Sequence, residues 1–149
     1  MTDLTYKPIE AQKVLIIEDD PEFSYYLRVV LEDEGFRTMI ADDGINAYNA
    51  IKTYLPDLIT LDLLLPNKTG IKLFTQLRKH NKFSSIPIIV ITSYSLNSYP
   101  AVDLKKTLYS NKLSPPEAFL EKPIESKELL STIQRILNNR NIYNMGLKG

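Results

Sequence analysis

The sequence predicts an α/β domain: a doubly wound, five-stranded parallel sheet in the order 2-1-3-4-5, flanked by five helices. Three observations predict it. Short apolar runs alternate with amphipathic segments along the chain, the pattern of a parallel sheet covered on both faces. The run over residues 86–91 is bulky and almost wholly apolar, as a buried central strand should be. All five apolar runs also end at polar residues: Asp42 and Asp43, after the second, are expected to cap a helix, and the other four mark strand ends outside which ligands bind in this architecture.

The first half of the chain supplies two strands and two helices. Residues 14–17 (VLII) are the first strand, and Asp20 followed by Pro21 forms a helix N-cap and first helical position. The helix carries an apolar stripe and ends near Gly35; the stripe consists of Phe23, Tyr26, Leu27, Val30 and Leu31. Residues 38–41 form a weaker second strand. The second helix follows Gly44 and stops before Pro56; its apolar face holds Ile45, Tyr48, Ile51 and Leu55.

The second half continues the alternation. Residues 58–61 are the third strand, and a helix with Ile71, Phe74 and Leu77 on one face follows the turn residues PNKTG. The fourth strand covers residues 86–91.

The segment 94–117 is the least regular part of the sequence. We expect a helix over about residues 101–110, opened by Pro100, and a loop over 111–117. Residues 118–121 form a short fifth strand. The last helix is marked by its apolar positions, Leu129, Leu130, Ile133, Ile136 and Leu137.

The length of 149 residues suits one domain, which we place at residues 13–140 between tails at 1–12 and 141–149. Lysine plus arginine equals aspartate plus glutamate at 18 each, so the chain lacks the basic excess of most nucleic-acid binders, and we expect no direct nucleic-acid contact. Cysteine is absent, which excludes disulfides and thiolate chemistry. The sequence contains neither a signal-peptide pattern nor an apolar run long enough for a membrane span, so we expect a cytoplasmic protein without membrane insertion.

Polar residues gather where the predicted strands end. Glu18 and Asp19 follow the first strand, Asp62 the third, Thr92 the fourth and Lys122 the fifth. Clustered acids repel one another unless a cation lies among them, which suggests a metal site; a helix N-cap is the alternative explanation of the first acidic run. Carboxylates from strands one and three can share a hard cation, most simply Mg²⁺. A carboxylate can also attack phosphorus and carry a phosphoryl group, which a metal, a lysine and a hydroxyl would then hold.

Four stretches, in this order, resemble one family: VLIIEDDPE, PDLITLDLLLPNKTGI, IPIIVITS and FLEKPI. The family is the receiver domain of two-component response regulators, which has a flavodoxin-like fold, and the resemblance covers about residues 13–138. It implies that Asp62 is the phosphoacceptor. It also implies that Asp19, Asp62 and the main-chain carbonyl of Leu64 hold Mg²⁺, with Glu18 supporting the metal through water.

By the same resemblance, Thr92 and Lys122 engage the phosphoryl group, Phe119 is the switch aromatic, and the peptide bond from Lys122 to Pro123 is cis. The donor would be a sensor histidine kinase or a histidine phosphotransfer protein. Phosphorylation would shift the face built from helix four, strand five and helix five, which would contact a downstream protein and is a candidate homodimer interface. The domain would not be an enzyme beyond self-phosphorylation and self-dephosphorylation.

Three features depart from the family pattern. The interval from Thr92 to Lys122 is long and contains three prolines, which puts the form of helix four in question. Phe119 replaces the more frequent tyrosine and so lacks its hydroxyl. Leu64 and Tyr94 are bulky where polar side chains can place an attacking water, so we expect slow self-dephosphorylation.

Other functions stay open from the sequence. A receiver-like scaffold that binds a partner without phosphorylation is the main alternative, and the irregular segment 94–117 motivates it. A phosphatase or phosphotransferase with an aspartyl nucleophile commonly has an acid two residues after the nucleophile, where this chain has Leu64. A flavodoxin-like cofactor carrier fits less well, because the acids after the first strand would repel a phosphate.

Overall fold

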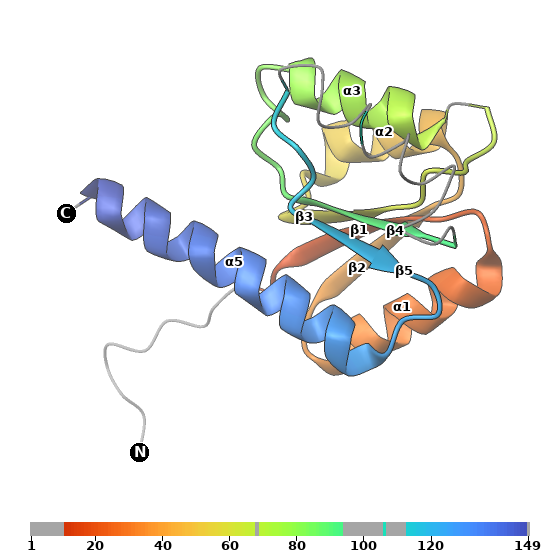
Figure 1. The fold of residues 1–149 in the computed structure, drawn as a ribbon, viewed down its shortest axis with the longest axis horizontal. Helices are drawn as coiled ribbons and strands as arrows, with labels where there is room; N and C mark the ends of the chain where they lie inside the picture. Colours follow the sequence, from red (N-terminus) through yellow and green to blue (C-terminus); the bar gives the residue numbers. More distant parts are fainter. Residues whose placement is uncertain (1–10, 68, 94–105, 107–112, 149) are drawn as a thin grey trace.

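The computed structural model describes residues 11–67, 69–93, 106 and 113–148, and for 141–148 only the backbone. Five parallel strands form one sheet in the order β2-β1-β3-β4-β5, which confirms the predicted topology. Helices α1 and α5 cover one face of the sheet, and α2 and α3 cover the other (Figure 1). The elements are β1 (Lys13–Ile17), α1 (Pro21–Asp33), β2 (Arg37–Ala41), α2 (Gly44–Tyr54), β3 (Leu58–Leu61), α3 (Gly70–Lys79), β4 (Ile88–Thr92), β5 (Ala118–Glu121) and α5 (Ser126–Lys148).

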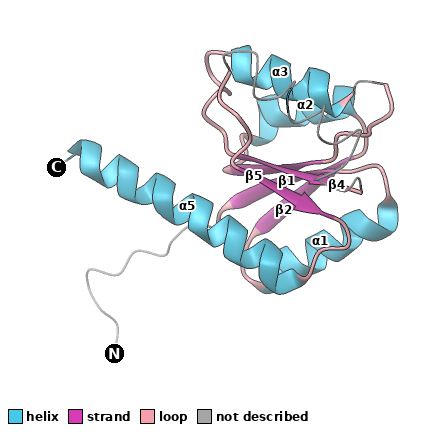
Figure 2. Ribbon diagram, viewed as in Figure 1, coloured by secondary structure: helices cyan, strands magenta, loops and turns pink. Residues whose placement is uncertain are grey.

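Three boundaries bear on the predictions. Of the helix expected over residues 101–110, only Lys106 is described, and it is helical; the described part of the chain shows four full helices rather than five. Strand β4 begins at Ile88 instead of residue 86, because the N–H of Ile86 donates to Phe83 in the preceding turn. Helix α5 continues to Lys148, so residues 141–148, expected as a tail, are helical; no proline interrupts them (Figure 2).

Strand alternation divides the core into two clusters. On the α2/α3 side, Ile17, Leu61 and Val90 pack with Leu73 and Phe74. The opposite cluster, on the α1/α5 side, is built mainly from Val14, Ile16, Leu27, Leu58, Ile89, Leu120, Leu129 and Ile133. All residues of β3 and β4 are buried, as expected of central strands covered on both faces.

The helices begin at polar caps that follow the strands. Asp20, Asp43 and Thr69 each accept a hydrogen bond from a main-chain N–H of the first turn they precede. Asp43 is therefore a cap, as predicted, and Asp20 is the cap member of the first acidic run. Because each cap follows the carboxyl end of a strand, the turns between strands and helices gather at one edge of the sheet.

Candidate functional site

Sheet hydrogen bonds continue past the strand ends and fix the backbone of the site. The main-chain N–H of Glu18 donates to β2, and that of Asp62 donates to β1, each over 3.0 Å. The N–H of Lys122 donates to the carbonyl of Thr92 over 2.8 Å. Glu18, Asp62 and Lys122 thus start from backbone positions that are set by the sheet itself.

Side chains from β1, β3 and β5 meet at this edge. The ammonium of Lys122 lies 2.6 Å from Oε1 of Glu18 and 3.2 Å from Oδ2 of Asp62. The remaining carboxylate oxygens bind nearby N–H groups, since Glu18 Oε2 accepts from Asp20 and Asp62 Oδ1 accepts from Leu64. Glu18 and Asp62 are buried, with 3% and 7% of their surface exposed, so these charges are largely withdrawn from water.

Carboxylate oxygens of Glu18, Asp19 and Asp62 all lie within 4.8 Å of one another. Asp19 is exposed, so the group is open to solvent on one side. Among the described residues, one ammonium pairs with two of the three carboxylates, which leaves the cluster short of positive charge. Hard oxygen donors from two neighbouring strands fit the ligand preference of Mg²⁺, which also keeps waters on its open side.

Burial dominates the electrostatics of Glu18. Burial and the nearby charge of Asp62 raise the pKa of Glu18 to about 7, although its hydrogen bonds to Lys122 and Asp20 act in the opposite direction. Burial also acts to lower the pKa of Lys122, but the hydrogen bond to Glu18 and the charges of both acids outweigh it and leave that pKa above its ordinary value. Lys122 therefore stays protonated near neutral pH, and Glu18 titrates there.

Thr92 lies beside this cluster, whereas Phe119 lies in β5, three residues before Lys122. Thr92 ends β4, with only 1% of its surface exposed, and it is joined to Lys122 through the main chain. Phe119 is half-buried in β5 and packs against the core on the α2/α3 side. The bond from Lys122 to Pro123 is cis, as predicted. Tyr94 lies outside the described residues.

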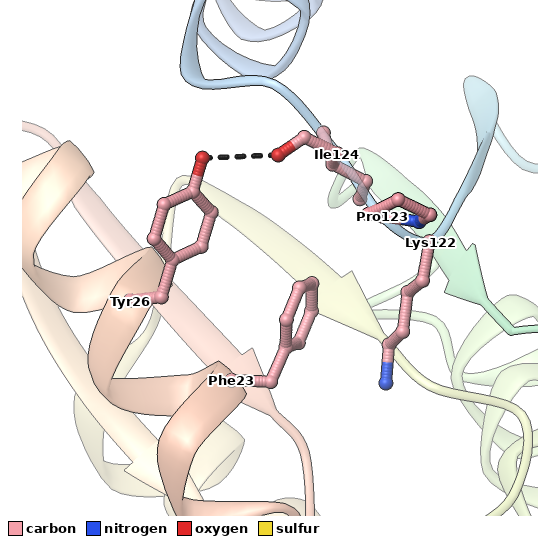
Figure 3. Close-up of a pocket in the computed structure, with 5 residues that line it drawn as sticks. All are labelled: Phe23, Tyr26, Lys122, Pro123 and Ile124. Carbon is pink, nitrogen blue, oxygen red and sulfur yellow. Dashed lines mark hydrogen bonds between the residues drawn. The ribbon is translucent and has the colours of Figure 1, made fainter.

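One neighbour of the site was not singled out from the sequence. Phe23, in the first turns of α1, places its ring under the ammonium of Lys122, and Figure 3 shows both beside Tyr26, Pro123 and Ile124. These five residues line an open pocket of about 400 Å³. The sequence signal was the apolar stripe of the first helix, which indicates a core face and carries no sign of a contact with a lysine about 100 residues away.

The fold and this cluster define a class of signalling domain, and comparison with known families agrees. Residues 14–134 match the family model of the response regulator receiver domain, and the chain belongs to that family. None of the helices in the described ranges is long and apolar enough to cross a membrane.

The relatives include both regulators and kinases. The chain is 33% identical over 123 residues to the DNA-binding response regulator MtrA of Mycolicibacterium smegmatis; the match covers 83% of this chain and 49% of that protein. The chain thus spans about half the length of the curated relatives it matches.

Solved structures are similar as well. The signal receiver domain of a signal transduction histidine kinase from Syntrophus aciditrophicus has a TM-score of 0.74 at 29% identity, covering 87% of this chain and 92% of that one. The receiver domain of sensor histidine kinase PA1611 from Pseudomonas aeruginosa, which holds a magnesium ion in its active-site cleft, has a TM-score of 0.71 at 26% identity, covering 84% and 96%.

Proposed function

We propose that this domain is the phosphoacceptor module of a two-component system, in which Asp62 takes a phosphoryl group from a phosphohistidine donor in a Mg²⁺-dependent reaction. The observation that carries the proposal is the pair of contacts from Lys122 to Glu18 and Asp62 inside a cluster of three carboxylates. An acid that served only as a helix cap would not need a half-buried lysine that follows the far strand of the sheet.

The transfer is a substitution at phosphorus. A carboxylate oxygen of Asp62 forms a bond to phosphorus, the P–N bond of the donor breaks, and its electron pair returns to the imidazole nitrogen. Lys122, 3.2 Å from Asp62, is close enough to neutralise a phosphoryl oxygen there. The buried hydroxyl of Thr92 would bind another of these oxygens.

The ligands proposed for Mg²⁺ are Asp19, Asp62 and the main-chain carbonyl of Leu64, with Glu18 acting through water. When bound, the ion supplies positive charge to the phosphoryl oxygens and to the carboxylates around them. Asp62 Oδ1 already accepts the N–H of Leu64, which orients that carboxylate without using the lysine. Self-phosphorylation from small donors and self-dephosphorylation would be the module's only chemistry.

The partners in this proposal are a sensor histidine kinase or histidine phosphotransfer protein as donor, and a downstream protein that reads the change. Thr92 and Phe119 would pass the change to the face that includes β5 and α5, which is also the candidate homodimer face. The domain would act in the cytoplasm without inserting into a membrane. DNA binding is named for the longer relative, and we propose that this domain makes no direct nucleic-acid contact.

The deciding experiment is incubation with acetyl phosphate, with and without Mg²⁺, followed by intact mass measurement of the wild type and Asp62→Asn. We expect one added phosphoryl group in the wild type, dependent on Mg²⁺ and absent in the variant. No gain from acetyl phosphate and none from a phosphohistidine donor, in protein that still binds Mg²⁺, would reject the proposal in favour of a scaffold that works without phosphorylation.

A further inference from the structure

The ring of Phe23 makes a cation–π contact with the lysine of the site. The ammonium nitrogen of Lys122 lies 4.3 Å from the ring centroid, well inside the distance of about 6 Å at which an aromatic face attracts a cation. Only 18% of the Lys122 side chain is exposed, so water screens this attraction weakly. Figure 3 shows the lysine side chain running alongside the ring.

Helix α1 holds this ring and the backbone next to the lysine together. The rings of Phe23 and Tyr26 lie one turn apart on α1, with centroids 6.1 Å apart and planes at 32°. The hydroxyl of Tyr26 donates to the carbonyl of Ile124, two residues after Lys122, over 2.9 Å (Figure 3). One helix therefore contacts both the side chain of the lysine and the loop that carries it.

A core role alone does not account for the position of the ring. Phe23 packs in part against the α1/α5 core, but the ring also lines the open pocket of about 400 Å³ and is only half-buried. A leucine would make the same core contact. An aromatic face adds attraction for the ammonium, which an aliphatic side chain does not provide.

We infer that Phe23 is a positioning residue for Lys122, holding its ammonium at the phosphoacceptor through the ring face; this inference rests on the proposed function. Lys122 binds Glu18 at 2.6 Å and Asp62 at 3.2 Å, so a phosphoryl group on Asp62 has to draw the ammonium away from Glu18. The ring attracts the cation over its whole face, without a single acceptor atom. The ammonium keeps this contact as it moves from one oxygen to another.

The kinetic test compares phosphorylation rates at fixed acetyl phosphate and saturating Mg²⁺, followed by intact mass. We expect Phe23→Leu to slow phosphorylation roughly threefold to tenfold, because the cation–π attraction is lost while the apolar contact remains. Phe23→Tyr, which retains the ring face, is expected to stay within about twofold of the wild type. Tyr25→Leu is the matched control, since Tyr25 is an α1 aromatic with 65% of its surface exposed, and its rate should be unchanged.

A second test detects the contact without any phosphorylation. Urea unfolding of the wild type, Phe23→Leu, Lys122→Met and the double variant, without Mg²⁺, gives the coupling between the two side chains. We expect the coupling to change the unfolding equilibrium constant about threefold to tenfold. A merely structural role of Phe23 would give additive effects.

The outcomes separate the two proposals. A wild type that takes up no phosphoryl group from either donor would overturn the proposed function and this inference with it. A wild type that is phosphorylated at the same rate as Phe23→Leu, or a Phe23→Tyr variant as slow as Phe23→Leu, would overturn the inference alone. Additive effects in the unfolding cycle would also overturn it.

Discussion

The ammonium of Lys122 lies 2.6 Å from a carboxylate oxygen of Glu18, a residue 104 positions earlier in the chain. The sheet order brings the two together, because both residues follow the carboxyl ends of strands. The carboxylate is almost fully buried and the lysine side chain is mostly buried. We therefore expect the stability of the domain to depend on pH and on cations.

The first prediction concerns pH. The pKa of Glu18 is about 7 in the folded chain and about 4.5 when unfolded, so between these values the folded state binds more protons than the unfolded state. The free energy of unfolding should therefore fall as pH rises from 5 to 8, by on the order of 2 kcal/mol without divalent cations. Urea unfolding at several pH values measures this slope. Glu18→Gln removes the titrating group and should flatten it; an equal slope in that variant contradicts the prediction.

The second prediction concerns the lysine in the absence of metal. Lys122→Met leaves three clustered carboxylates without their ammonium and should lower the free energy of unfolding by about 1–3 kcal/mol in Mg²⁺-free buffer. Added Mg²⁺ should stabilise this variant more than the wild type, because the ion then supplies the missing positive charge. Thermal unfolding across a Mg²⁺ titration measures both effects. Lys127→Met, at an exposed position of α5, is the control, and an equal response of both variants to Mg²⁺ would contradict the prediction.

The third prediction concerns Gly70, the first residue of α3. A Cβ atom at this position would lie 2.5 Å from both the carbonyl oxygen of Asp62 and the Cα of Leu63. Since those atoms are backbone, Gly70→Ala has to displace the chain at Asp62 and Leu63, and we expect a loss of about 2 kcal/mol or more together with weaker Mg²⁺ binding.

Gly35→Ala is the matched control for that substitution. Gly35 has a φ of +91° but nothing within 4 Å of the added Cβ. Its replacement should cost about 1 kcal/mol through backbone strain and leave Mg²⁺ affinity unchanged. Urea unfolding and a Mg²⁺ titration of both variants separate strain from displacement; a Gly70→Ala variant with wild-type Mg²⁺ affinity would show that the site does not depend on this close approach.

The fourth prediction concerns Arg78, a buried arginine of α3 that binds the segment before β5. Its guanidinium pairs with Glu117 over 2.8 Å, and Glu117 also accepts the N–H of Ile88 at the start of β4. The same guanidinium donates to four main-chain carbonyls, those of Ser84, Ile86, Ser114 and Pro115.

Removing the Arg78 guanidinium should lower the free energy of unfolding strongly. Arg78→Met leaves those carbonyls without this donor and Glu117 without its cationic partner, and we expect a loss of about 3–5 kcal/mol in the free energy of unfolding. Glu117→Gln keeps hydrogen-bonding atoms in place and should cost clearly less. Urea unfolding of both variants tests the comparison, and similar losses would contradict it.

The fifth prediction concerns the lifetime of the phosphoryl group. The side chain of Leu64, two residues after Asp62, is 48% exposed and offers no group to orient an attacking water. We expect slow self-dephosphorylation in the wild type and a several-fold shorter lifetime in Leu64→Asn, measured by mass after donor removal.

Leu55→Asn is the control for the lifetime. Leu55 is a similarly exposed leucine, but it lies at the C-terminal end of α2, away from Asp62, and its left-handed backbone suits asparagine. The phosphoryl lifetime in Leu55→Asn should equal that in the wild type. A wild-type half-life of seconds would contradict the prediction.

The strands and the binding edge were predictable because they follow from local patterns, and the sheet order followed from the rule for doubly wound sheets. Buried parallel strands read as continuous apolar runs, and the polar residues directly after them mark the binding edge, which is how Glu18, Asp19, Asp62 and Lys122 could be expected to meet. Helix extent was less predictable. The end of α5 was placed too early, because the apolar stripe that marks a buried face stops before the helix itself does.

Periodicity and strand-end position are properties of neighbouring residues, so the strands and the acids and lysine at their carboxyl ends could be inferred without coordinates. Which side chains these residues contact depends instead on how the helices pack against the sheet. Phe23 contacts Lys122, and Arg78 donates to the segment before β5; both contacts join residues far apart in the chain. The burial that raises the pKa of Glu18 also depends on residues far apart in the chain. Such contacts depend on distances in the packed state. An apolar stripe or a lone arginine looks the same in the sequence whether or not the contact forms.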